Sequence, residues 1–193
     1  MIQEDQTGLF FLELNQMDKL KIICIDPGHG GDDNGATWGF VEEDDTNLSI
    51  AFLLRYELEK LAFDVRMTRV RDVYVSLPQR SLAANLIPAD LFVSIHCDAF
   101  HTLTAEGMSL HIHPQAGDDT IKIAGSIHRS LRAEFPGHRD RGVRRSDFHV
   151  LRKTNMSAVL IECEFLSNPI TRDFLHEPEN QLDLARAIAR GVS

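Results

Sequence analysis

Short apolar runs typical of β-strands alternate with longer amphipathic segments from about residue 20 onward, and this alternation is the strongest constraint on the fold. A buried strand is predicted over Lys21–Asp26 (KIICID), which runs into a Pro-Gly-His-Gly-Gly loop. A helix is predicted over Asn47–Leu61, with Asp45 or Thr46 as its cap. No repeat or linker divides the sequence. We therefore predict one α/β domain over residues 21–193.

The remaining elements are predicted from β-favouring residues and from apolar residues at helical spacing. Strands are expected at Phe63–Thr68, Asp90–Cys97, Met108–His113, Phe148–Leu151 and Ala158–Glu162. Helices are expected at Leu77–Leu86, with Ser76 before it and Pro78 in its first turn, and near Asp119–Phe135 and Gln181–Arg190.

Two histidines and one carboxylate form a candidate metal site. His29 lies in the glycine-rich loop after the first strand, Glu42 or Glu43 precedes the first long helix, and His96 ends a strand. Ligand sites in open α/β sheets form beyond the carboxyl ends of strands, where His29, His96 and Glu162 all fall. Catalytic zinc takes three ligands from His and Asp or Glu and keeps a fourth position open. Spacing alone leaves two interpretations, a metal site or ordinary hydrogen-bonded and surface histidines.

Composition argues against several classes of partner. The net charge of −9 offers no basic footprint for nucleic acid or anionic lipid. Residues 1–20 are acidic and hold only a short apolar stretch, so we expect an N-terminal arm and neither a signal peptide nor a membrane span. Cys24, Cys97 and Cys163 form no C-x-x-C pair and no even set, which indicates buried free thiols.

An ordered series of motifs runs from the first strand to the last. IDPGHGG at Ile25–Gly31 is followed by DNGA at Asp33–Ala36 and by EDDTNL at Glu43–Leu48. Further motifs are Thr68–Asp72, Arg80–Asn85, Ala89–Ala99 and VLRKTNMSAVLIECEFLSNP at Val150–Pro169. In content and order they resemble the zinc-dependent N-acetylmuramoyl-L-alanine amidases of the amidase type 3 family.

The resemblance covers the chain from Lys21 onward and implies a single twisted, mostly parallel sheet flanked by helices. It selects Glu43 over Glu42 and implies that His29, Glu43 and His96 hold Zn²⁺. Glu162 would be the catalytic glutamate, acting as base and then as acid while a zinc-activated water hydrolyses the bond between N-acetylmuramic acid and L-alanine in peptidoglycan. Asp26 is interpreted either as a partner that orients a ligand imidazole or as a loop cap.

Some residues depart from the family pattern. Cys97-Asp98 replaces the frequent Ala-Asn, Ser157 replaces a proline and Glu164 replaces a glycine. Glu164 would either share a face with Glu162 and raise its pKa, or point to solvent. The basic run His138–Arg145 is either a solvated loop or a binding site for a stem-peptide carboxylate, through Arg144 and Arg145.

Other functions stay open beside the amidase. A zinc peptidase acting on stem peptides would share the metal and the base, a wall-binding module would bind without turnover, and a purely structural domain would bind no zinc. We expect a monomer that acts on the cell wall or in the periplasm. Without a signal peptide it would be a lysin released by a holin, a secreted effector or a periplasmic amidase that has lost its leader.

Overall fold

The computed structural model describes residues 21–193, and the predicted N-terminal arm lies outside them. Eight strands are present among these residues: β1 Ile22–Pro27, β2 Thr37–Trp38, β3 Val41–Glu42, β4 Asp64–Met67, β5 Leu91–Asp98, β6 Met108–Ile112, β7 Asp140–Arg145 and β8 Ser157–Phe165. The helices are α2 Glu43–Lys60, α3 Leu77–Leu86, α4 Asp118–Glu134, α5 His149–Lys153, α6 Pro169–His176 and α7 Pro178–Val192.

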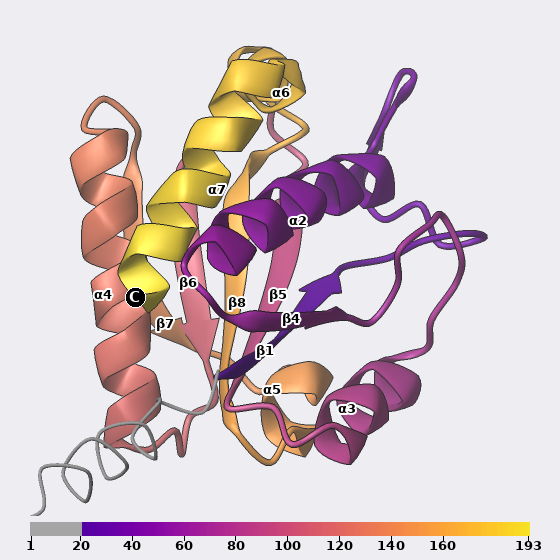
Figure 1. The fold of residues 1–193 in the computed structure, drawn as a ribbon. Helices are drawn as coiled ribbons and strands as arrows, with labels where there is room; N and C mark the ends of the chain where they lie inside the picture. Colours follow the sequence, from indigo (N-terminus) through magenta and orange to yellow (C-terminus); the bar gives the residue numbers. More distant parts are fainter. Residues whose placement is uncertain (1–20) are drawn as a thin grey trace, which may run out of the picture.

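One six-stranded sheet organises the domain, in the order β4-β1-β5-β8-β6-β7. Strands β4, β1, β5 and β8 are parallel, β6 is antiparallel to β8, and β7 is parallel to β6. Helices α2, α4 and α7 cover one face, and α3 and α5 lie against the other (Figure 1). The predicted α/β fold with a mostly parallel sheet is confirmed.

Side chains along the central strands point alternately to the core face and to the face that carries the site. Ile95 and Ile161 belong to the larger core beneath α2, α4 and α7. Their neighbours His96 and Glu162 point to the opposite face, because successive strand residues alternate between faces. There the smaller cluster packs under α3 and α5 and covers only part of the sheet. Polar side chains near the carboxyl ends of β5 and β8 therefore reach a cavity.

The helices α2 and α3 form where they were predicted, but the predicted start of α2 is wrong. Helix α3 begins after Ser76, whose backbone N–H donates to the Gln79 side chain over 3.0 Å, as in a capping box. Helix α2 begins at Glu43 rather than Asn47, so the predicted caps at Asp45 and Thr46 are wrong. The extra turn brings Glu43 into the first turn of the helix.

The strand predicted at Phe148–Leu151 is wrong. Phe148 is the N-cap of the short helix α5, which buries Val150 and Leu151 against β8. A short apolar run fits a buried helical turn as well as a strand. Strand β7 was not predicted, because Asp140–Arg145 is mostly charged and exposed, as suits an edge strand.

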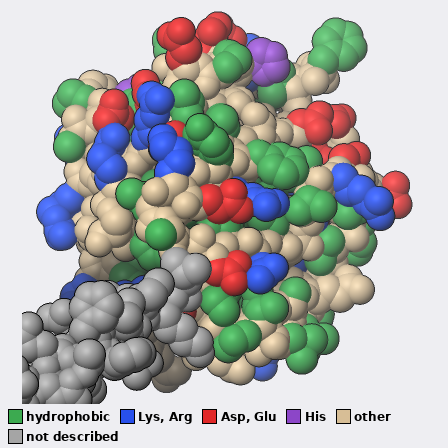
Figure 2. Space-filling view, viewed as in Figure 1, with side chains coloured by type: hydrophobic (Ala, Val, Ile, Leu, Met, Phe, Trp, Pro, Cys, Tyr) green, Lys and Arg blue, Asp and Glu red, His purple; other side chains and the backbone are tan. Residues whose placement is uncertain are grey.

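The surface over α2 and α7 has a mixed character. Acidic, basic and hydrophobic side chains are interspersed over the described part of this face (Figure 2). No helix in residues 21–193 is both long and apolar enough to span a bilayer.

Candidate metal and catalytic site

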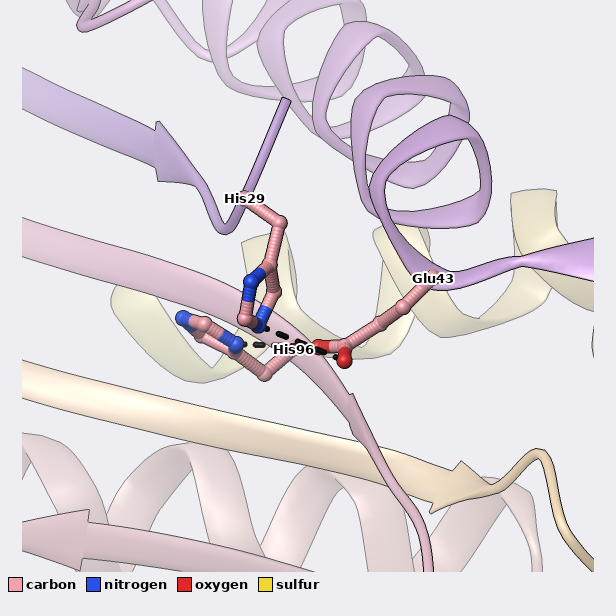
Figure 3. Close-up of side chains that lie close together, drawn as sticks. All are labelled: His29, Glu43 and His96. Atoms are coloured by element: carbon pink, nitrogen blue, oxygen red, sulfur yellow. Dashed lines mark hydrogen bonds and ion pairs between the residues drawn. The ribbon is translucent and has the colours of Figure 1, made fainter. Parts of the chain in front are cut away.

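His29, Glu43 and His96 come together from three elements. His29 lies in the loop after β1, Glu43 at the start of α2 and His96 near the end of β5 (Figure 3). Glu43 Oε2 is 3.3 Å from His29 Nε2, and Glu43 Oε1 is 3.0 Å from His96 Nδ1. One ligand atom from each of the three residues lies within 4.8 Å of the others. The group can therefore hold a metal ion.

Two glycines allow the backbone to approach these side chains. A Cβ on Gly28 would stand 2.2 Å from His96 Cε1, far inside contact distance. Gly35 has a φ of +67°, and a Cβ there would stand 2.5 Å from Glu43 Oε2. His29 itself has a φ of 60°, which is uncommon for a residue with a side chain. The glycine-rich sequence around His29 thus serves the close packing of the group.

Asp33 orients the His29 ring. Its Oδ1 lies 2.9 Å from His29 Nδ1, so a proton on Nδ1 leaves Nε2 free to face Glu43. This role was not predicted for Asp33, although the residue begins the D-x-G-A motif that follows the histidine. Of the two interpretations of Asp26, the orienting partner is wrong, because within residues 21–193 Asp26 makes no hydrogen bond to an imidazole; its carboxylate accepts hydrogen bonds from Thr68, Ser94 and Arg80.

Two buried arginines hold the loop that carries His29. Arg80 pairs with Asp26 over 2.9 Å and donates to the carbonyl oxygens of Pro27 and His29, each over 2.6 Å. Arg69 donates to the carbonyl oxygens of Pro27 and Gly28, over 3.0 and 2.9 Å. Both arginines lie within the sequence motifs Thr68–Asp72 and Arg80–Asn85, and this role was not predicted for either. Because a guanidinium presents several N–H donors in a fixed geometry, each fixes more than one carbonyl of the loop.

The charges of the group favour an ionised carboxylate between two imidazoles. Burial alone would raise the pKa of Glu43, but hydrogen bonds with His29 and His96 outweigh it and hold that pKa well below its usual range. Burial lowers the pKa of His29, yet Glu43 and Asp33 together raise it to about 9. The same balance between burial and Glu43 raises the pKa of His96. A metal cation would replace the imidazole protons at this position.

Glu162 lies beside His96 with one oxygen free. The two residues face each other across the β5–β8 pairing, and Oε2 of Glu162 is buried without a hydrogen-bond partner among the described residues. His29, His96 and Glu162 line one cavity of about 240 Å³, together with Tyr74 and His149. Burial raises the pKa of Glu162 to about 7; the charges of Asp98 and Glu43 add to the rise, and His96 opposes it. A buried carboxyl with such a pKa is suited to proton transfer.

The expectation that Glu164 points to solvent is wrong. Strand β8 continues to Phe165, and Glu164 is fully buried rather than directed to solvent. Its carboxylate accepts the N–H of Gly107 over 2.6 Å and lies 2.9 Å from His138 Nδ1, and Glu164 is not among the main causes of the raised Glu162 pKa. The residue ties two loops to the sheet. The predicted buried thiols are confirmed at Cys24, Cys97 and Cys163.

Comparison with known proteins gives consistent matches over nearly all of the described chain. Residues 23–193 match the family model Amidase_3, described as N-acetylmuramoyl-L-alanine amidase. The chain is 36% identical over 173 residues to N-acetylmuramoyl-L-alanine amidase CwlM of Bacillus licheniformis, a match that covers 89% of this chain and 67% of CwlM.

Solved structures agree with that match. The N-acetylmuramoyl-L-alanine amidase from Clostridium difficile 630 is similar with a TM-score of 0.87 and 36% identity, over 90% of this chain and 95% of that one. The catalytic domain of CwlV from Bacillus (Paenibacillus) polymyxa var. colistinus gives a TM-score of 0.84 at 32% identity, over 90% and 96% of the two chains.

Proposed function

Since the chain belongs to the N-acetylmuramoyl-L-alanine amidase family, we propose that it hydrolyses the amide bond between N-acetylmuramic acid and L-alanine in peptidoglycan, with zinc held by His29, Glu43 and His96. The observation that carries this proposal is the buried Glu162 carboxylate, whose Oε2 has no hydrogen-bond partner among the described residues and which lines one cavity with His29 and His96. A carboxylate with no intramolecular partner, beside a cluster of metal-ligating side chains, has the environment that a general base requires.

The donor set fits zinc. Two imidazole nitrogens and one carboxylate oxygen make a three-residue set typical of catalytic zinc sites, which leave one position open. The hydrogen bond between Asp33 and His29 matches the outer-shell support that zinc-binding histidines usually receive. A zinc ion bound there would polarise a carbonyl group and lower the pKa of a bound water.

Glu162 supplies the proton transfers. Its carboxylate accepts a proton from the attacking water and then delivers that proton to the nitrogen of the departing L-alanine. Amide hydrolysis needs the second step, because an amine leaves poorly until it is protonated. Burial raises the pKa of Glu162 to about 7, which favours uptake of a proton by this carboxylate.

Digestion of purified peptidoglycan tests the proposal. We would compare the zinc-loaded protein with the chelated protein, with Glu162→Gln, and with Glu59→Gln as a control at an exposed carboxylate of α2. Products would be identified by mass spectrometry. We expect stem peptides with a free L-alanine amine from the zinc-loaded protein and from the control. Chelation should abolish release, and Glu162→Gln should reduce it by about 10²-fold or more while retaining zinc.

Two outcomes would replace the proposal. Cleavage within the stem peptide would establish a peptidase, and zinc binding with firm attachment to walls but no product would establish a binding module. If the chelated protein releases stem peptides at the full rate, the protein is an amidase that does not need zinc.

A further inference from the structure

The three arginines of β7, Arg141, Arg144 and Arg145, form no ion pair within residues 21–193, whereas two arginines outside that strand do. Arg132 lies 3.4 Å from Asp140, and Arg152 lies 2.6 Å from Asp147. Within residues 21–193, no carboxylate forms an ion pair with Arg141 or Arg144; Asp98 lies close enough that both charges oppose the rise that burial causes in its pKa. Unpaired guanidinium groups in an acidic protein point to an anion from outside the molecule.

Arg144 lies on the same face of the sheet as Glu162. It pairs with His111 in the β6–β7 register, and Ser109, two residues before His111, pairs with Glu162. Residues two apart on a strand share a face, so Glu162, Ser109, His111 and Arg144 follow one another across β8, β6 and β7. Burial lowers the pKa of His111 to about 4, and the charge of Arg144 adds to that shift, as expected for a guanidinium on the same face.

His111 itself is fully occupied. Its Nδ1 lies 2.7 Å from the Ser146 hydroxyl and its Nε2 lies 3.1 Å from the Ser109 hydroxyl. Its ring packs 5.2 Å from that of Phe148, which lines the Glu162 cavity. The buried Ser109 and His111 side chains therefore lie between the Glu162 cavity and the exposed Arg144.

Most donors of Arg144 remain available. Among the described residues, its Nε donates to the Arg141 carbonyl oxygen over 3.2 Å, and the guanidinium is exposed. Arg141 is fixed beside it, with Nε donating to Glu106 O over 2.6 Å and the guanidinium 4.4 Å from the centre of the Phe165 ring. Arg144 is therefore able to donate two hydrogen bonds to a carboxylate, and Arg141 provides a second positive charge in a fixed position beside it.

We propose that Arg144, with Arg141 beside it, binds the α-carboxylate of the second stem-peptide residue when the L-alanine amide lies at Glu162. The inference rests on the proposed function. β8 and β7 are two strand spacings apart, roughly 10 Å, and Arg144 lies two residues, roughly 7 Å, further along the sheet than Glu162, so their Cα atoms are roughly 12 Å apart. A carboxylate one residue beyond the scissile alanine lies roughly 7 Å from the amide, and the arginine side chain bridges the remainder. The stem peptide therefore crosses β6 and β7, and the chain selects stems whose second residue keeps a free carboxylate.

Arg145 provides a matched control. It pairs with Ile112, a residue of the core beneath α4, so it points to the opposite face from Arg144. Its Nη1 donates to the Pro114 carbonyl oxygen over 2.5 Å. Arg144 and Arg145 are adjacent in sequence and equal in charge, but their side chains lie on opposite faces of the sheet.

Binding in a Glu162→Gln background with zinc tests the inference without turnover. The ligands are two N-acetylmuramoyl tripeptides, both amidated at the C-terminus, which differ in a free or an amidated α-carboxylate on the second residue. We expect the free-acid ligand to bind more tightly. Arg144→Gln should weaken its binding by about 10- to 100-fold, the range for a charged hydrogen bond, and leave the amidated ligand unchanged. Arg145→Gln should change neither ligand by more than about twofold.

Several results would overturn the inference: no discrimination between the ligands, equal effects of Arg144→Gln and Arg145→Gln, or no binding of either ligand. Thermal melting of both variants checks that folding is unaffected. Turnover of the same ligands by the wild-type protein is read separately. Failure to cut either ligand would count against the proposed function, while the binding comparison would still decide the role of Arg144.

Discussion

Removal of the Asp33 carboxylate should weaken zinc binding through His29. Asp33 Oδ1 lies 2.9 Å from His29 Nδ1 and also accepts the Gly35 N–H over 3.3 Å. Loss of such an outer-shell partner typically lowers metal affinity by about 10- to 100-fold. Because the Asp33 side chain is 47% exposed, solvent screens its charge, and we expect a loss near tenfold for Asp33→Ala. That loss corresponds to about 1.4 kcal/mol.

The expected loss depends on pH. Burial lowers the pKa of His29, but Glu43 and Asp33 raise it to about 9, so the proton competes with zinc at neutral pH. Asp33→Ala lowers this pKa and thereby eases the proton competition as well. The affinity gap between wild type and variant should therefore be smaller at pH 7 than at pH 9.

Competition for zinc with a chromophoric chelator at both pH values would measure these affinities. Asp32→Ala is the control, because Asp32 is the exposed neighbour and makes no side-chain hydrogen bond within residues 21–193. Asp33→Asn keeps an acceptor oxygen and removes the charge, so it should fall between wild type and Asp33→Ala. If Asp33→Ala and Asp32→Ala bind zinc equally at pH 9, Asp33 does not support the metal site.

The remaining predictions concern the charges around the site. Asp98→Asn removes a negative charge that raises the pKa of Glu162, so the acid limb of the kcat/KM profile on peptidoglycan should move to lower pH; an unmoved limb would contradict this assignment. Arg80→Met breaks the buried pair with Asp26 and should cost about 3–5 kcal/mol in urea unfolding, whereas Arg66→Met at the exposed Asp64 pair should cost less than about 1 kcal/mol. For His111, burial and the charges of Arg144 and His96 lower the folded-state pKa to about 4, below the unfolded value near 6.5. Its contribution is complete above pH 6.5 and is lost as the pH falls towards 4, by up to about 3 kcal/mol, so His111→Gln should flatten the pH dependence of unfolding in that window.

The sequence alone determined the fold class and the residues of the candidate site. Strand periodicity, turn glycines and helix caps are local signals, so Lys21–Asp26, Leu77–Leu86 and Asp90–Cys97 lie close to β1, α3 and β5. Position at the ends of predicted elements left Glu42 and Glu43 open, and the resemblance to the amidase type 3 motifs selected His29, Glu43 and His96.

Contacts between residues distant in sequence were decided by the tertiary structure. The burial of Glu164 depends on Gly107 and His138, and no local pattern places either beside it. The sequence does not distinguish Arg144 from Arg145, but the pairing of β7 with β6 places their side chains on opposite faces of the sheet. Strand β7 has little apolar signal of its own, because an edge strand is defined by its backbone pairing with a neighbour. Which carboxylate orients a histidine likewise depends on a distance of a few ångströms, and that distance exists only once the loops have packed.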